Sequence, residues 1–441
     1  MLALLLAAGL GSSNFTATGP PGCQKLALEG VLALHSFMYE DARASFRKAE
    51  EQAPCPIAFW GEAMTYDHPL WGEEDKKAAQ AALARIPADA KVSPAEAGLI
   101  DAARALYAGG HDAWRDRLSR LHRELPRDDE VALFFALSLY ATSDHGKDVR
   151  RAMQAAAIAM DVFERNPDHP GAAHYLIHAC DSPDHAVLAL KAAQKYARIA
   201  PAASHALHMP SHIFVQLGMW ADVERSNTAA FAASRQHGRP DWHSFSWLAD
   251  ARVELGRPDE VLPMIEEARK QAPARVTAEL VGLWLSATGH WARAGALLAG
   301  LPADVAARVR LDAAAAQGDE AAVAAAGVKD EHLVAAKEKV AHSVRDPGTI
   351  SAAIEAMRLL ADAEDAEPVS GPAFALPARE ELGDLLLRSH RFAEAEKAFE
   401  AALRKRPNRR HALQGLTLAA RGAGDAQAAA DADAALSAQR E

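Results

Sequence analysis

The feature that most constrains the fold is a set of small, aromatic and proline residues that occurs twice with the same spacing. Near the N-terminus the set is Gly30, Ala42, Phe46, Ala49 and Pro54. Near the C-terminus it is Gly383, Ala395, Phe399, Ala402 and Pro407. Small residues let two antiparallel helices approach closely, the aromatic ring fills the space between successive pairs, and proline ends the second helix. The pattern predicts an all-α chain built as a solenoid of helical hairpins.

Composition agrees with this fold and excludes one class of partner. Hydrophobic residues make up 50 % of the chain but aromatic residues only 6 %, and alanine dominates, which favours closely packed helices over sheets. The net charge is -11, from 59 acidic and 48 basic residues, and no basic stripe is present. Nucleic acid is therefore not expected as a partner. No stretch is apolar enough to be expected to span a membrane.

The spacing resembles that of the tetratricopeptide repeat (TPR), whose period is about 34 residues. The resemblance implies an αα superhelical solenoid in which the first helix of each repeat lines a concave groove. Further repeats start at Ile57, Ser204 and Trp242. The period is degraded at about 69–135 and 276–361, where helical pairs are still expected from apolar residues three or four apart.

The expected organisation has four parts. They are a leader at 1–22, the solenoid at 23–361, an acidic and proline-containing linker at 362–375, and a C-terminal repeat pair at 376–441. Residues 1–10 are almost wholly apolar but too short to span a bilayer, and a small and polar tract follows them. This predicts a secretory leader and export to the periplasm or the exterior. The alternative is a cytoplasmic protein with a buried or frayed N-terminal segment.

Two of the three cysteines bracket the first expected hairpin. Cys23 begins its first helix and Cys55 follows its second, so both lie at the same end of an antiparallel pair. This geometry permits a disulfide, which an exported protein could keep. Two ordinary buried thiols are the equal alternative. Cys180 has no obvious partner.

Histidines concentrate between His169 and His212. Carrying the groove-facing positions of the repeat onto this sequence places five of them on two successive groove helices and three more in the same groove. The resulting candidate metal ligands are His35, His68, His174, His178, His205, His208, His212 and His243. His174 and His178 are at i, i+4, the spacing that places two ligands on one helical face.

Neutral imidazole suits Zn, Cu or Fe, and a nearby carboxylate could complete the site. The candidate carboxylates are Asp181, Asp184 and Glu224. Pro210 leaves the local structure open, because it either kinks a continuous helix or begins a new one. In the second case His205 and His208 would lie on a loop leading into the helix.

Several segments resemble those of a group of bacterial TPR proteins. They are residues 35–39 (HSFMY), 59–64 (FWGEAM), 68–71 (HPLW), 169–178 (HPGAAHYLIH) and 208–214 (HMPSHIF). The group has no activity to carry over, so this resemblance implies a fold and a shared histidine set, and no chemistry.

Three functions compete on this sequence. The first is a groove with a transition metal site, serving metal binding or metal-dependent chemistry. The second is an interaction scaffold whose groove binds a peptide or partner protein without metal. The third is a metal-free catalytic pair of histidines. No catalytic residue can be named, so whether the protein is an enzyme is left open.

Overall fold

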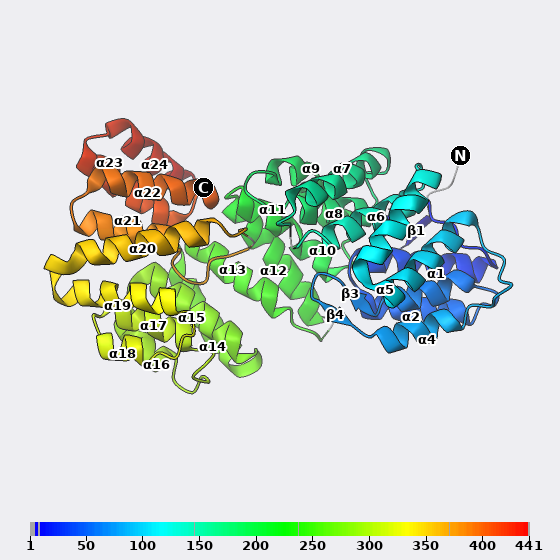
Figure 1. The fold of residues 1–441 in the computed structure, drawn as a ribbon, viewed down its shortest axis with the longest axis horizontal. Helices are drawn as coiled ribbons and strands as arrows, with labels where there is room; N and C mark the ends of the chain where they lie inside the picture. The colour runs from blue at the N-terminus through cyan, green and yellow to red at the C-terminus, as the bar shows by residue number, and fades with distance from the viewer. Residues whose placement is uncertain (1–4, 8, 145, 237, 370, 440–441) are drawn as a thin grey trace. The chain divides into compact units, whose positions relative to one another are not determined.

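The computed structural model describes residues 5–7, 9–144, 146–236, 238–369 and 371–439. The chain divides into two compact units, residues 1–213 and 214–441, and each is described by itself (Figure 1). The described residues are predominantly α-helical, as the sequence predicts. None of the helices in the described ranges combines the length and apolar character needed to cross a membrane.

The first unit contains two short strand pairs and a succession of helices. In chain order these are β1 (Leu5–Ala7), β2 (Gly11–Ser13), α1 (Pro21–His35), α2 (Tyr39–Glu50), α3 (Pro56–Met64), β3 (Asp67–His68), β4 (Glu73–Glu74), α4 (Lys76–Ala84), α5 (Pro94–Glu124), α6 (Asp129–Ala141), α7 (Val149–Arg165), α8 (Pro170–Ala179), α9 (Ala186–Ile199), α10 (Ser204–His208) and the start of α11 (Pro210–Gln216).

The described part of the second unit contains helices and no strand. In chain order it contains α12 (Trp220–Gln236), α13 (Trp242–Glu254), η1 (Pro258–Glu260), α14 (Val261–Gln271), α15 (Ala274–Thr288), η2 (Trp291–Arg293), α16 (Ala294–Leu297), α17 (Ala307–Ala316), α18 (Glu320–Ala324), α19 (Glu331–Arg345), η3 (Pro347–Thr349), α20 (Ile350–Asp365), α21 (Ala378–Arg388), α22 (Phe392–Lys405), α23 (Arg410–Ala423) and α24 (Ala426–Ala438).

The repeat pattern in the sequence corresponds to contacts between glycine and phenylalanine. A Cβ atom on Gly30 of α1, or on Gly61 of α3, would lie 2.6 Å or 2.2 Å from the ring of Phe46 on α2. In the second unit Phe399 of α22 is in the same relation to glycines of α21 and α23. The aromatic ring thus occupies space that only glycine leaves open on the neighbouring helices. These contacts confirm the predicted TPR-like packing.

The turn between the helices of a hairpin requires a left-handed residue. Gly218 and Gly256 fill this place with φ of 66° and 77°. Between α1 and α2, and between α21 and α22, Phe37 and His390 fill it with φ of 54° and 55°. Non-glycine residues are strained in this region, so Phe37 holds its ring in place at a cost in backbone energy.

The N-terminal segment forms a strand pair that the sequence did not predict. Leu5–Ala7 pairs antiparallel with Gly11–Ser13, and three residue pairs are too few to leave a periodic signal. The Ser12 amide donates to the Asp168 carbonyl oxygen at 3.0 Å, and Ser12 and Ser13 are buried. Residues 1–4 and 8 of the expected leader lie outside the described residues. The strand that follows Leu10 is thus in contact with the body of the unit.

Cys23 and Cys55 are joined by a disulfide that ties the start of α1 to the residue before α3, with Cα atoms 5.6 Å apart. The bonded alternative is therefore the one that the structure contains. Cys180 is a buried free thiol, and burial raises its pKa to about 12. It is therefore protonated and unreactive at neutral pH.

The linker begins later than the sequence predicts. Helix α20 continues to Asp365, because Asp362 and Asp365 both pair with Arg379 of α21, at 2.6 Å and 2.7 Å. Between residues 69 and 135 the hairpin of β3 and β4 and the kinked helix α5 replace regular repeats. From α21 to α24 each helix packs on the next, as expected for a repeat pair (Figure 1).

Candidate metal centre

Five histidine side chains of the first unit form a closed ring of imidazoles. Helix α8 contributes two, α10 two and α11 one. The centroid distances around the ring are 4.8 Å for His174–His178, 6.0 Å for His178–His212, 5.1 Å for His212–His208, 6.3 Å for His208–His205 and 4.9 Å for His205–His174. The structure thus brings together the five histidines that the repeat register places on successive groove helices.

Three Nε2 atoms converge within this ring. His174 Nε2 lies 3.1 Å from His178 Nε2 and 3.1 Å from His205 Nε2. In a neutral imidazole, the partner of one nitrogen decides whether the other carries a proton or a lone pair. His174 Nδ1 is 2.6 Å from the backbone oxygen of His35, which can only accept. Nδ1 therefore carries the proton, and the lone pair of His174 lies on Nε2.

Burial keeps His174 and His178 in the neutral form that binds metals. Burial lowers the pKa of His174 to about 3. The pKa of His178 lies well below its usual value because of burial and then because of the neighbouring imidazoles, His174 first among them. Protonation at neutral pH therefore does not compete with binding of a cation at this place.

Of the carboxylates considered from the sequence, Asp181 contacts the ring. Its Oδ2 accepts from His212 Nδ1 at 2.8 Å, so it orients an imidazole in the way that carboxylates next to metal-binding histidines do. Asp184 is exposed. Glu224 belongs to the second unit and pairs with Arg257 at 2.5 Å, so its charge is already matched there.

An aromatic wall lies beside the three converging nitrogens. The ring of Phe37 is 4.3 Å from that of His174, centroid to centroid, and 5.7 Å from that of His205. Trp71 stands 6.1 Å from His205 and is 53 % exposed. Such an exposed indole next to buried imidazoles offers an apolar surface to anything that approaches the site.

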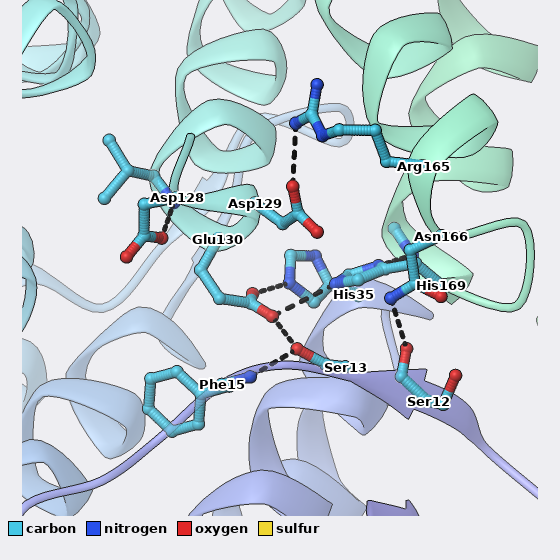
Figure 2. A network of polar contacts seen from close by, with 12 residues as sticks. Ser12, Ser13, Phe15, His35, Asp128, Asp129, Glu130, Arg165, Asn166 and His169 are labelled. Atoms are coloured by element: carbon cyan, nitrogen blue, oxygen red, sulfur yellow. Dashed lines mark hydrogen bonds and ion pairs between the residues drawn. The ribbon is translucent and has the colours of Figure 1, made fainter. Parts of the chain in front are cut away.

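A second polar centre, drawn in Figure 2, surrounds Glu130 and is buried. The carboxylate of Glu130 on α6 accepts from His35 Nε2 at 2.6 Å and from His169 Nε2 at 3.0 Å. The Ser13 hydroxyl also donates to it. The other ring nitrogen of His35, Nδ1, lies 2.9 Å from the Tyr175 hydroxyl oxygen. Although burial opposes ionisation, the imidazoles of His35 and His169 lower the pKa of Glu130 far below its usual value.

Two histidines and a carboxylate form a familiar metal-binding set, but the protons argue against a metal here. The Gly171 amide donates to His169 Nδ1 at 3.1 Å, so His169 Nδ1 holds the lone pair and Nε2 holds the proton. Nε2 then donates to Glu130 and cannot ligate an ion. His169 is thus fixed as a hydrogen-bond donor to Glu130. His174, in contrast, carries the lone pair on its Nε2.

Three of the histidines predicted as ligands are not members of this ring of the first unit. His35 directs its ring to Glu130 and contributes only its backbone oxygen to His174, because it is the last residue of α1. His68 follows the end of α3, so it is not on a groove helix. It binds Glu73 at 3.0 Å and stacks on Tyr39. His243 is an exposed residue in the first turn of α13, in the second unit.

Pro210 begins a helix, and the loop expected before it is itself helical. Helix α10 ends at His208 and α11 starts at Pro210. Met209 between them keeps helical dihedral angles, with φ of -52° and ψ of -35°. His205 and His208 are thus on a short helix, and His208 and His212 keep an approximate i, i+4 relation across the junction.

Sequence reasoning missed Glu130 and the roles of Ser13 and His169. Glu130 lies in the stretch where the repeat period is degraded, and Ser13 lies in the expected leader. His169 did carry a signal, because a polar residue directly before Pro170 is typical of a helix N-cap. The N-cap contact from Gly171 is what fixes its tautomer.

No protein-family model matches the chain, and no curated protein matches it. Among solved structures, the human IFIT1 dimer with PPP-AAAA is 14 % identical, over 94 % of this chain and 91 % of that chain, with a TM-score of 0.36. The TPR domain of P58(IPK) is 14 % identical, over 92 % and 99 %, with a TM-score of 0.25. Yeast Tom70 is 13 % identical, over 95 % and 96 %, with a TM-score of 0.27. At these values, the assignment of a TPR-like solenoid rests on the helix pairs and glycine–phenylalanine contacts described above.

Proposed function

We propose that the protein is a TPR-like binding protein whose first unit holds a transition metal ion on the Nε2 atoms of His174, His178 and His205. The observation that carries this proposal is the convergence of these atoms at 3.1 Å while the Nδ1 proton of His174 faces a backbone oxygen. Ligands about 2.0–2.1 Å from a tetrahedral ion lie roughly 3.3 Å from one another. The distances from His174 Nε2 to the other two nitrogens are close to that spacing.

The ligand set favours zinc, copper or iron, which neutral imidazoles bind well. Three protein ligands leave one position of a tetrahedral ion open, as in zinc sites that carry out catalysis. A water there would have its pKa lowered towards about 7, or a donor atom of a substrate would replace it. Phe37 and Trp71 would contact the apolar part of such a substrate.

The test is elemental analysis of untagged protein purified without chelators. Wild-type protein is expected to retain a near-stoichiometric amount of zinc, copper or iron after dialysis, and the His174→Ala/His178→Ala double variant to retain little. His342→Ala is the matched control, because His342 is half-exposed in the second unit and pairs with Glu320. It is expected to retain the same metal as wild type.

Absence of metal from the wild type, even after growth with added zinc, copper and iron, would overturn the proposal. The alternative would then be a scaffold whose groove binds a peptide or partner protein, with the imidazoles as its lining. Such binding would be insensitive to chelators. A metal-free histidine pair with catalytic activity would instead show turnover in protein freed of metal.

We also propose that the protein is exported. The disulfide between Cys23 and Cys55 supports this, because disulfides persist in oxidising compartments. The buried contacts of Ser12 and Ser13 support a cleaved leader that ends before Gly11, in place of one that ends at residue 22. Intact-mass measurement of the protein from its native compartment tests both points. A mature chain that begins after Ser13, or a chain with free thiols at both cysteines, would contradict them.

A further inference from the structure

The ring of five imidazoles contains more ligands than one ion uses. A tetrahedral ion takes four ligands, and His174, His178 and His205 already converge with their Nε2 atoms. His208 and His212 complete the ring at 5.1 Å from each other, centroid to centroid. This second pair stands one repeat after the first pair and at the same positions of the repeat, but it is divided between α10 and α11. The ring therefore contains two repeat-related pairs, each about one helical turn in length, with His205 between them.

The second pair is prepared for binding by a neighbouring carboxylate. Asp181 Oδ2 lies 2.8 Å from His212 Nδ1, and the two side chains are 6 % and 12 % exposed. A carboxylate that accepts from Nδ1 places the lone pair of the imidazole on Nε2 and raises its basicity. His212 is thus oriented as His174 is, but by a carboxylate in place of a backbone oxygen. His208, 2 % exposed, lies beside it.

We propose that the ring holds two transition metal ions, one on His174, His178 and His205 and the other on His208 and His212. The inference rests on the proposed function for the first ion. With two imidazoles from the ring in place of three, the second ion is expected to be held less tightly than the first. The ring edges that join the two groups are 6.0 Å and 6.3 Å long. Pairs of metal ions about 3.5–4 Å apart bind one oxyanion between them, so the proposal includes a phosphate or carboxylate group bound by both ions.

The experiment uses the full chain, freed of metal with a chelator and titrated with Co²⁺, whose visible absorption reports its ligands. Wild-type protein is expected to bind two equivalents, the second at least tenfold more weakly than the first. The His208→Ala/His212→Ala variant is expected to bind one, and inorganic phosphate to change the absorption of the two-ion form only. Asp181→Asn is expected to weaken the second equivalent by about 10–100-fold and to leave the first unchanged. Circular dichroism establishes that each variant is folded, and His342→Ala controls for exposed imidazoles.

The outcomes separate the two proposals. A single equivalent in wild type that is unaffected by His208→Ala/His212→Ala overturns the second site and leaves the proposed function standing. A single equivalent that this variant abolishes overturns the division of the ring into two sites. No equivalent at all overturns both proposals. Two equivalents with no response to phosphate overturn the bridging oxyanion.

Discussion

The carboxylate of Glu130 shows how a single buried residue can organise several segments. It accepts from side chains of α1, of the residue before α8 and of the N-terminal strand β2. The backbone oxygen of His35, whose ring Glu130 holds, in turn orients His174. Glu130 is therefore a positioning residue for the proposed site, although it does not belong to it. A buried charge of this kind is tolerated only because donors surround it.

The change Glu130→Gln is expected to destabilise the first unit by about 3 kcal/mol, in the range for breaking a buried charge pair. An amide keeps the shape, but its NH₂ group would face one of the N–H donors. Asp129→Asn is the matched control, since Asp129 pairs with the half-exposed Arg165 and its loss is expected to cost below about 1 kcal/mol. Urea unfolding measures both. Equal effects for the two variants would show that the hydrogen bonds to Glu130 contribute no more than a surface pair.

At this scale the sequence predicted which five histidines come together but not the residues that orient them. The repeat register identifies which residues of a groove helix share a face, and this was sufficient for His174 and His178. It carries no information on proton positions, which depend on contacts between distant segments. His35 was expected as a ligand because its position in the repeat faces the groove. The Glu130 carboxylate that accepts from its ring is on α6, where the repeat could not be followed in the sequence.

At the scale of elements, α8 must approach α1 closely for His174 to reach the His35 backbone oxygen. Gly171 makes this approach possible, because a Cβ atom there would lie 2.5 Å from His35 Nδ1. That ring cannot move away, since both of its nitrogens are engaged by Tyr175 and Glu130. The glycine therefore sets the separation of the two helices that assemble the site.

The change Gly171→Ala is expected to destabilise the protein by about 2 kcal/mol or more, within the range for overpacking, and to weaken binding of the first metal ion at least tenfold. Gly295→Ala is the matched control, because Gly295 is also helical and has open space at its Cβ position. There the change is expected to stabilise by about 0.5–1 kcal/mol. Denaturant unfolding and Co²⁺ titration measure the two effects. Unchanged metal affinity in a folded Gly171→Ala variant would show that the distance between α1 and α8 does not control the site.

Element boundaries could be predicted where the repeat is regular and not where tertiary contacts override it. The hairpins at both ends of the chain follow from glycine, phenylalanine and proline spacing. The junction at Pro210 could not be settled, because proline fits both a kink and a first turn. The short strand pairs left no signal, since a pair of two or three residues depends on its surroundings more than on its own sequence.

For the whole molecule, the buried titratable groups predict opposite responses of the two units to acid. In the first unit, burial lowers the pKa of His35, that of His178, and that of His174 to about 3. The unfolded chain takes up protons on these histidines as the pH falls through about 6.5, whereas the folded unit does not. Their contribution to stability is thus lost between about pH 6.5 and these lowered values, at about 1.4 kcal/mol per pH unit for each histidine.

In the second unit the pKa values of Asp250 and His411 are raised. Burial, and then the carboxylate of Glu254, raise the pKa of Asp250 to about 7. Although burial disfavours its charge, hydrogen bonds to Asp384 and Glu380 raise the pKa of His411 to about 10. The folded unit therefore binds more protons than the unfolded chain near neutral pH. Stability from His411 is fully present below about pH 6.5, and stability from Asp250 is gained as the pH falls from 7 towards 4.

Metal-free protein moved from pH 7.5 to pH 5 is therefore expected to lose stability in the first unit, by a few kcal/mol, and to gain it in the second. Each unit has its own buried helices, so hydrogen exchange of amides in α8 and in α13, corrected for the intrinsic effect of pH, can follow the two separately. His174→Gln/His178→Gln should flatten the response of the first unit and Asp250→Asn that of the second.

Parallel loss of stability in both units would mean that Asp250 and His411 do not retain their protons. No loss in the first unit would mean that its buried imidazoles are charged at pH 5, and a charged imidazole cannot bind a metal ion. The pH response thus tests, without any metal present, whether His174 and His178 are held in the neutral form that the proposed site requires.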